Sequence, residues 1–154
     1  MQLYTIGSSG WSAQQFFTAL QRAGVRRILD IRQGGATLLS GFAIKRDLPY
    51  LARAVAQIDY LLLLDLAPAA ELFRAYRRHT ISNAQYLQAY RQQVLDSNII
   101  DRLEATTVDG GVLLCSEREP DTCHRRVAAD LLVRRWPELQ VTHLTPTPAR
   151  ALMV

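Results

Sequence analysis

The first 32 residues contain a short apolar segment, an amphipathic stretch and a second apolar segment, in that order. Residues 3–6 and 25–31 are expected to be strands. Between them, Ser12 with Gln15 three residues later has the spacing of a helix capping box, and Gly24 suits the position just after a helix. This order predicts a β-α-β unit, which requires a parallel strand pair joined by a right-handed crossover.

The same alternation continues to the end of the chain. Helices are expected over residues 47–56, 68–78, 82–106 and 122–136, and strands over residues 58–64, 112–115 and 139–144. The apolar run in residues 58–64 predicts a strand buried on both faces, and residues 33–41 are expected to form a loop. We therefore predict one α/β domain over residues 1–144, with three α/β/α layers and a mainly parallel sheet of about five strands. Residues 145–154 are expected to be a C-terminal tail.

Composition limits the class of protein without identifying a ligand. The chain has 154 residues and a formal charge of +4, and Lys45 is its one lysine, so arginine supplies nearly all the basic side chains. These arginines are scattered, which gives only weak support for a nucleic-acid surface. No apolar run approaches the ~20 residues that span a bilayer, and the N-terminus has no signal-peptide pattern. We expect a cytoplasmic protein with two reduced cysteines and no membrane association.

Nearly every reactive type of side chain gathers in residues 113–126. An apolar run ends in Cys115 and Glu117, a loop containing a proline follows, and an amphipathic helix then begins with Cys123, His124 and Arg125. A buried strand, a polar loop and a helix N-terminus form the usual place for a ligand site in an open α/β sheet. The sequence therefore predicts the location of a site.

Three of these residues are candidates for chemistry. Cys115 is the candidate nucleophile, because a nearby helix N-terminus lowers the pKa of a thiol. Glu117 and His124 are the candidates for proton transfer. The alternative for Cys115 and Cys123 is packing in the core, and the alternative for His124 is a structural hydrogen bond to a carbonyl at a strand end.

Three further residues are candidates for binding an anionic substrate. Arg32 and Arg125 form a predicted clamp for phosphate or carboxylate, and Ser8 follows a glycine in a turn at the end of the first strand. The alternative is that Arg32 pairs with Asp30, and Arg125 with Glu117, in internal salt bridges. Two cysteines fit no zinc motif, and a metal would need the loop to fold back, so no metal site is expected.

The order of these motifs resembles the bacterial and archaeal family called Domain of Unknown Function 488. Its most specific signature, Cys-(Ala/Ser)-Glu, then Pro, then Cys-His-Arg, matches Cys115-Ser116-Glu117, Pro120 and Cys123-His124-Arg125. Weaker matches are Tyr4-Thr5-Ile6-Gly7-Ser8-Ser9, Leu29-Asp30-Ile31-Arg32, and Phe42 with Lys45 and Leu48. The resemblance implies an α/β fold and a site shared by the first, second and fourth strands. It implies no reaction.

This chain departs from the family pattern at positions near the expected site. Ser8 stands where the family usually has histidine, and Ala67-Pro68 replaces an expected double glycine. The leading hypothesis is a small enzyme acting on an anionic substrate such as a phosphate or a nucleotide. The alternative is a module with a vestigial site that binds a nucleotide, nucleic acid or a partner protein without catalysis. A homodimer is compatible with both, and the sequence identifies no cofactor.

Overall fold

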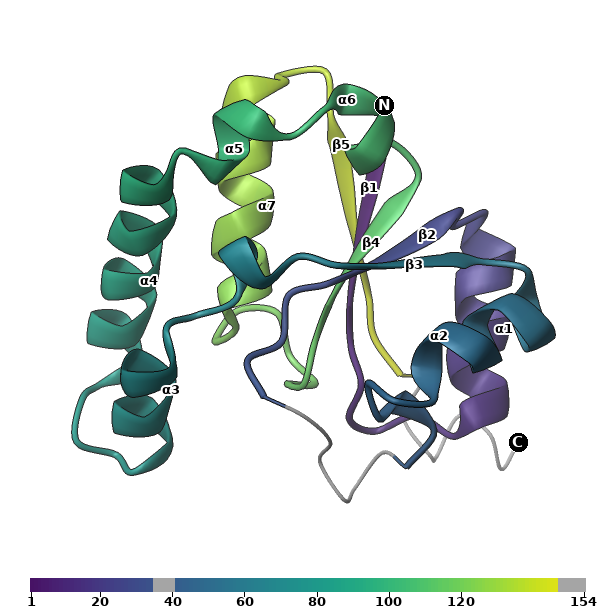
Figure 1. Ribbon diagram of the computed structural model, residues 1–154, viewed down its shortest axis with the longest axis horizontal. Helices are drawn as coiled ribbons and strands as arrows, with labels where there is room; N and C mark the ends of the chain where they lie inside the picture. The colour runs from purple at the N-terminus through teal and green to yellow at the C-terminus, as the bar shows by residue number, and fades with distance from the viewer. Residues whose placement is uncertain (35–40, 147–154) are drawn as a thin grey trace.

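A computed structural model describes residues 1–34 and 41–146. Its sheet contains five strands, all parallel, in the order β3-β2-β4-β1-β5 (Figure 1). The strands are β1 (Gln2–Gly7), β2 (Arg27–Asp30), β3 (Asp59–Leu62), β4 (Gly111–Cys115) and β5 (Gln140–Leu144). The predicted parallel sheet is confirmed, and β4 lies at its centre between β2 and β1.

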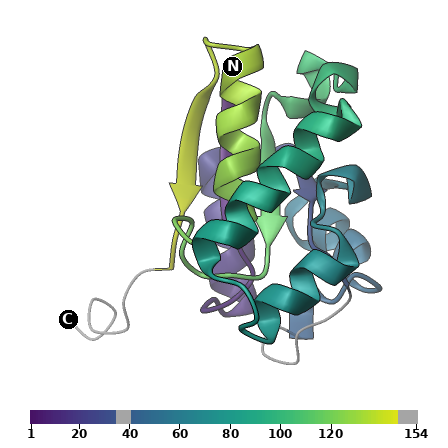
Figure 2. The same ribbon diagram turned by 90° about the vertical axis from the view of Figure 1, so that its left-hand side faces the viewer.

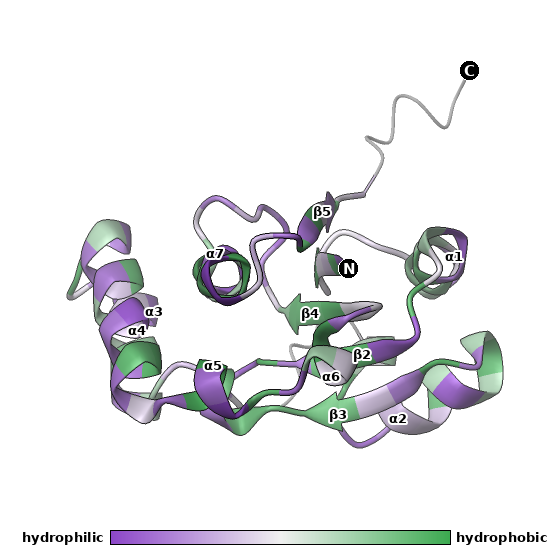
Figure 3. Ribbon diagram, turned by 90° about the horizontal axis from the view of Figure 1, so that it is seen from above, coloured by the Kyte–Doolittle hydropathy of each residue, from purple (hydrophilic) through white to green (hydrophobic). Residues whose placement is uncertain are grey.

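Helices cover both faces of this sheet (Figures 2 and 3). One face carries α1 (Ala13–Ala23) and α2 (Leu48–Leu51), which continues as a π-helical turn over Ala52–Ala56. The other face carries α4 (Asn83–Ser97), α5 (Ile99–Arg102), α6 (Ala105–Val108) and α7 (His124–Arg135), with α3 (Ala70–Arg77) beside α4. Short 3-10 turns occupy Gly41–Ala43 and Leu64–Leu66. In the part of the chain that is described, no helix is long and apolar enough for a membrane crossing.

Successive residues of each central strand point to opposite faces, which gives the domain two separate cores. Leu113 packs in the core beneath α4 and α7, whereas Val112 and Leu114 pack in the core beneath α1 and α2. All five residues of β4 are buried. A strand that is covered on both faces is held firmly in the sheet. The residues that follow β4 therefore begin at a fixed position on the carboxyl edge of the sheet.

Local signals set the helix that follows β1. Ser12 accepts a hydrogen bond from the Gln15 backbone at 3.1 Å, and the Gln15 side chain accepts one from the Ser12 backbone at 3.1 Å, so the predicted capping box is present. Gly24 ends the helix with φ of 77°, a left-handed conformation that favours glycine. These contacts set both ends of α1, which connects β1 to β2. The two strands are parallel as predicted, but they are not paired with each other, because β4 lies between them.

The prediction that residues 58–64 are buried on both faces is wrong. Among the described strands, β3 lies at the edge of the sheet and pairs with β2 alone, and Leu61, Leu62 and Leu64 are 40%, 41% and 57% exposed. Apolar composition alone cannot separate an edge strand from a central one, because both can carry a run of leucines.

The single helix predicted over residues 82–106 is also wrong. It ends at Ser97, because Asn98 takes φ of 56° and turns the chain into the short helices α5 and α6. Asparagine tolerates this left-handed conformation better than most residues do. Most of the predicted loop and most of the predicted tail fall at residues 35–40 and 147–154, outside the described residues.

Candidate functional site

The sequence-predicted residues gather where β4 ends and α7 begins. β1 and β2 flank β4, so Ser8 follows one neighbouring strand and Arg32 follows the other. Ser8 is buried, and its backbone N–H donates to the Cys115 carbonyl at 2.8 Å. Arg32 and Arg125 thus lie at the same edge of the sheet, as the convergence of parallel strands requires.

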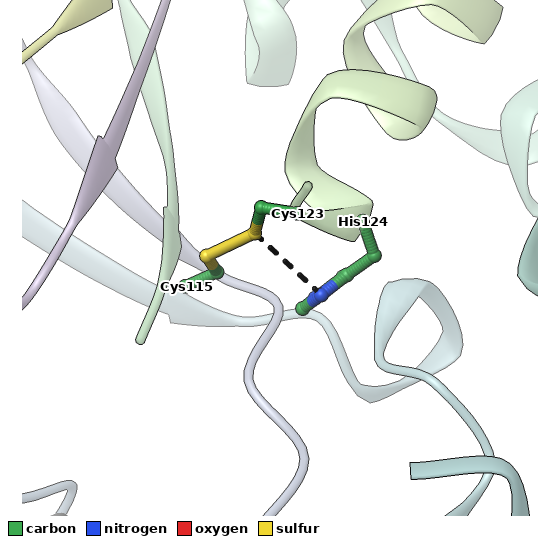
Figure 4. Close-up of side chains that lie close together, drawn as sticks. All are labelled: Cys115, Cys123 and His124. Carbon is green, nitrogen blue, oxygen red and sulfur yellow. Dashed lines mark hydrogen bonds between the residues drawn. A yellow bond between two sulfur atoms is a disulfide. The ribbon is translucent and has the colours of Figure 1, made fainter. Parts of the chain in front are cut away.

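The two cysteines are joined in a disulfide across this corner (Figure 4). This differs from the expected pair of reduced thiols, because the loop between them folds back and brings the N-terminus of α7 to the end of β4. Both side chains are fully buried. Cys123 is also the N-cap of α7, and its sulfur accepts the Arg125 backbone N–H at 3.5 Å.

His124 is held by one nitrogen and presents the other to the sulfurs. Its Nε2 lies 2.8 Å from the Ile31 carbonyl, which can only accept, so Nε2 carries the proton in the neutral ring. Nδ1 then has a lone pair, and it lies 3.9 Å from the Cys123 sulfur (Figure 4) and 3.5 Å from the Tyr86 hydroxyl. Burial lowers the pKa of His124 to about 4, so the ring is neutral at pH 7.

Arg125 is the largest fully buried side chain of the described protein. Its Nη1 donates to the Glu117 carbonyl at 2.5 Å and to the Cys115 sulfur at 3.2 Å, and its Nη2 donates to the Arg118 carbonyl at 3.0 Å. Its Nε donates to the Thr5 hydroxyl at 3.3 Å. Within the described residues, no carboxylate lies within ion-pair distance of this guanidinium. Burial lowers the pKa of Arg125 to about 10, which leaves it charged at pH 7.

Gly7 allows the loop between β4 and α7, whose carbonyls hold Arg125, to approach β1. A Cβ at this position would lie 1.6 Å from the Glu117 carbonyl oxygen and 2.9 Å from Arg125 Nη1. The carbonyl that holds the guanidinium therefore occupies the space of the missing side chain. This role of Gly7 was not predicted from the sequence, and neither were the contacts of Thr5 and Tyr86.

Arg32 has a carboxylate of its own. Its Nε and Nη2 donate to the two oxygens of Asp30 at 2.9 and 2.8 Å, and its Nη1 donates to the Ala43 carbonyl at 2.6 Å. The Tyr60 hydroxyl donates to the same carboxylate at 2.5 Å, and burial together with this bond raises the pKa of Tyr60. The Arg32–Asp30 alternative considered from sequence is therefore present, as a buried ion pair.

The backbone carbonyl and the side-chain carboxylate of Glu117 accept hydrogen bonds from different residues. The backbone carbonyl holds Arg125, so the internal pair considered from sequence runs through the main chain and not through the carboxylate. The carboxylate is half-buried and accepts a hydrogen bond from the Thr122 hydroxyl at 3.1 Å. Burial raises the pKa of this carboxyl.

Open space lies elsewhere in the molecule. A cavity of about 550 Å³ between α1 and the end of β5 is lined by residues that include Trp11, Gln15, Arg22 and Leu144, and by none of the six candidate residues. The corner that contains the sulfurs is closed, because Cys115, Cys123 and Arg125 have no exposed surface. A reaction at this corner must therefore involve groups that are already buried there, or a molecule that enters when the loop over residues 116–122 opens.

Comparison with curated proteins and with solved structures found no match to this chain. A family model described as "Domain of unknown function DUF488" matches residues 12–132, which include β2 and β4, both cysteines, His124 and Arg125. The chain therefore belongs to the DUF488 family.

Proposed function

We propose that Cys115 and Cys123 form a reversible thiol–disulfide centre, in which Arg125 stabilises the reduced state. The observation that carries this proposal is the fully buried Arg125 guanidinium, which donates to the Cys115 sulfur at 3.2 Å and has no carboxylate within ion-pair distance among the described residues. The carboxylates of Glu117 and Glu119 favour the charged guanidinium, but neither makes an ion-pair contact with it, and a buried charge without a contacting partner costs several kcal/mol. A thiolate at Cys115 would supply that contacting partner.

Both sulfurs are surrounded by groups that favour negative charge. The Glu117 backbone N–H donates to the Cys115 sulfur at 3.4 Å, in addition to the Arg125 guanidinium. Cys123 lies at the N-terminus of α7, where the free N–H groups of the helix favour an anion. Environments of this kind lower the pKa of a thiol and activate it for thiol–disulfide exchange.

The proposed reaction transfers two electrons and one proton to the protein, and the second proton of the reductant goes to solvent because Cys115 stays a thiolate. A dithiol compound or protein attacks the Cys123 sulfur, forms a mixed disulfide with it and releases Cys115 as a thiolate beside Arg125. The second thiol of the reductant then attacks the mixed disulfide and releases Cys123. This second thiol loses its proton as it attacks, and His124 Nδ1, 3.9 Å from the Cys123 sulfur, is placed to pass that proton to the departing Cys123 sulfur. Because both sulfurs are buried, the loop over residues 116–122 must open for exchange.

The two arginines that were expected to bind an external anion are already occupied by groups of the protein. Arg32 already holds the Asp30 carboxylate, and Arg125 faces carbonyls and a sulfur. The anion that Arg125 can accept without rearrangement is the Cys115 thiolate, which makes an external phosphate or nucleotide the less favoured candidate. Binding of such a ligand would require the Arg125 contacts to the loop to break.

Redox titration tests the proposal directly. The metal-free protein is equilibrated in dithiol–disulfide buffers over a range of potentials, quenched with acid, alkylated under denaturing conditions and weighed by mass spectrometry. We expect both thiols to disappear together, with a tenfold change in ratio for every ~30 mV. Independent modification of the two cysteines, or no disulfide at any potential, would refute a two-electron centre.

Arg125→Met tests the role of the buried cation. Loss of a charged hydrogen bond to the thiolate, worth about 1.5–3 kcal/mol, should favour the disulfide and make the midpoint potential more negative by about 30–60 mV. Arg126→Met is the matched control, because Arg126 follows Arg125 in the same helix but is half-exposed and pairs with Asp121. Equal midpoints for the two variants would contradict stabilisation by Arg125.

A further inference from the structure

We infer that the reduced site binds one Cu(I) ion through the sulfurs of Cys115 and Cys123 and Nδ1 of His124. This inference rests on the proposed function in one respect, because both cysteines must be reduced before they can act as ligands. Cys115, Cys123 and His124 are all buried, and their ligand atoms lie within 4.8 Å of one another. The sequence led us to expect no metal site, since the two cysteines fit no zinc motif.

The spacing of the ligand atoms suits a bound ion. Metal–sulfur and metal–nitrogen bonds of ~2.3 and ~2.0 Å place two ligands of one ion about 3.6 Å apart, and Nδ1 lies 3.9 Å from the Cys123 sulfur. The Cα atoms of the two cysteines are 7.6 Å apart, wider than the ~4.4–6.8 Å usual for disulfides. The backbone therefore leaves room for an ion between the sulfurs once the disulfide is reduced.

The histidine is oriented as metal-ligating histidines are. Such a residue usually donates its second ring N–H to a carbonyl or carboxylate, which fixes the ring and the tautomer. Here Nε2 donates to the Ile31 carbonyl at 2.8 Å, so the lone pair of Nδ1 faces the sulfurs (Figure 4). This carbonyl belongs to the residue that follows β2, so the sheet itself holds the third ligand in place.

Ligand number and charge favour Cu(I) over zinc. The group contains three ligands among the described residues, whereas structural zinc sites have four. Thiolates select soft ions such as Cu(I). Two thiolates with Cu(I) carry one net negative charge, and the buried Arg125 guanidinium at 3.2 Å from the Cys115 sulfur neutralises it. Two thiolates with Zn²⁺ are already neutral and would leave Arg125 without a contacting negative charge.

Competition for Cu(I) tests the inference. The full chain, reduced and kept without oxygen, is titrated into the coloured Cu(I) complex of bicinchoninate. We expect the wild type to remove one Cu(I) per chain and the disulfide form to remove none. Cys115→Ser, Cys123→Ser and His124→Ala should each weaken binding by more than ~100-fold, since even outer-shell changes at metal sites cost ~10–100-fold. Cys123→Ser keeps a good helix N-cap, so its loss of binding does not depend on loss of α7.

The control and the redox titration separate the two proposals. His79→Asn changes an exposed histidine that makes none of these contacts and should bind Cu(I) as the wild type does. Failure of the wild type to compete, unchanged binding in His124→Ala, or retention of zinc in preference to Cu(I) would overturn the inference. The thiol–disulfide couple is measured without metal, so each proposal can fail while the other stands.

Discussion

Gly7→Ala is the sharpest test of how the site is assembled. The new Cβ would lie 1.6 Å from the Glu117 carbonyl oxygen, whereas comfortable contact needs about 3.5 Å. The loop or the strand must therefore move by roughly 2 Å. β1 is paired on both sides, with β4 and β5, so the loop is the part that should yield. The Glu117 carbonyl would then leave Arg125 Nη1.

The expected cost has two parts. Overpacking of a tight site typically costs about 1–3 kcal/mol, and loss of a charged hydrogen bond costs about 1.5–3 kcal/mol. We expect Gly7→Ala to lower the free energy of unfolding by about 3–5 kcal/mol, which corresponds to a fall in Tm of about 10 °C for a domain of this size. Urea denaturation followed by far-ultraviolet circular dichroism measures this loss.

Gly41→Ala is the matched control for the lost glycine. A Cβ at Gly41 meets nothing within 4 Å, and its backbone is not left-handed, so the free energy of unfolding should change by less than about 0.5 kcal/mol. Gly7→Ala should also make the midpoint potential of the cysteine pair more negative, because Arg125 loses its position. Equal stability of the two variants would refute the close approach of the loop to β1.

Three further predictions concern stability. Asp30→Ala leaves Arg32 buried without its carboxylate and should lower the free energy of unfolding by about 3–5 kcal/mol. Tyr60→Phe removes one hydrogen bond to the same carboxylate and should lower it by about 1.5–3 kcal/mol. A smaller loss of stability for Asp30→Ala than for Tyr60→Phe in urea titrations would contradict the buried pair. The pKa of His124 is lowered from 6.5 to about 4, so only the unfolded chain binds its proton between these values. The free energy of unfolding should therefore fall by about 3 kcal/mol as the pH drops from 6.5 to 4. His124→Gln should lack this part of the acid sensitivity. The same pH dependence of unfolding in both proteins would exclude this contribution of His124. Ser82→Ala removes the side-chain cap of α4 and should cost about 1 kcal/mol in thermal melts, and an unchanged Tm would show that the cap contributes nothing.

The parts of the fold that depend on local signals could be predicted from the sequence. Ser12 with Gln15 and the following Gly24 define both ends of α1, because capping bonds and a left-handed residue act within one turn of the chain. The position of β3 at the edge could not be predicted, since strand order depends on contacts between distant segments. Asn98 illustrates a third case, in which the residue type permits a helix break without requiring one.

The same division applies to the candidate site. A strand end followed by a helix N-terminus placed Cys115, Cys123 and His124 in one neighbourhood, and the structure brings them together. Their partners were not predictable, because they are mostly backbone atoms. Arg125 is held by the carbonyls of Glu117 and Arg118, and His124 by that of Ile31. Every residue has a carbonyl, so residue identity carries no signal for such contacts.

The two buried arginines at this edge differ in how their charges are balanced, and this difference favours a redox centre over an anion clamp. Arg32 has a permanent counter-charge in Asp30, which is fully buried beside it. Among the described residues, Arg125 donates hydrogen bonds only to neutral acceptors and to the sulfur of Cys115. The Glu117 and Glu119 carboxylates favour its charge without an ion-pair contact. A clamp for an external anion would need both guanidinium groups to be accessible, and neither is. A group whose charge appears on reduction and disappears on oxidation can balance Arg125 from within the closed site, and Cys115 is the residue placed to do so.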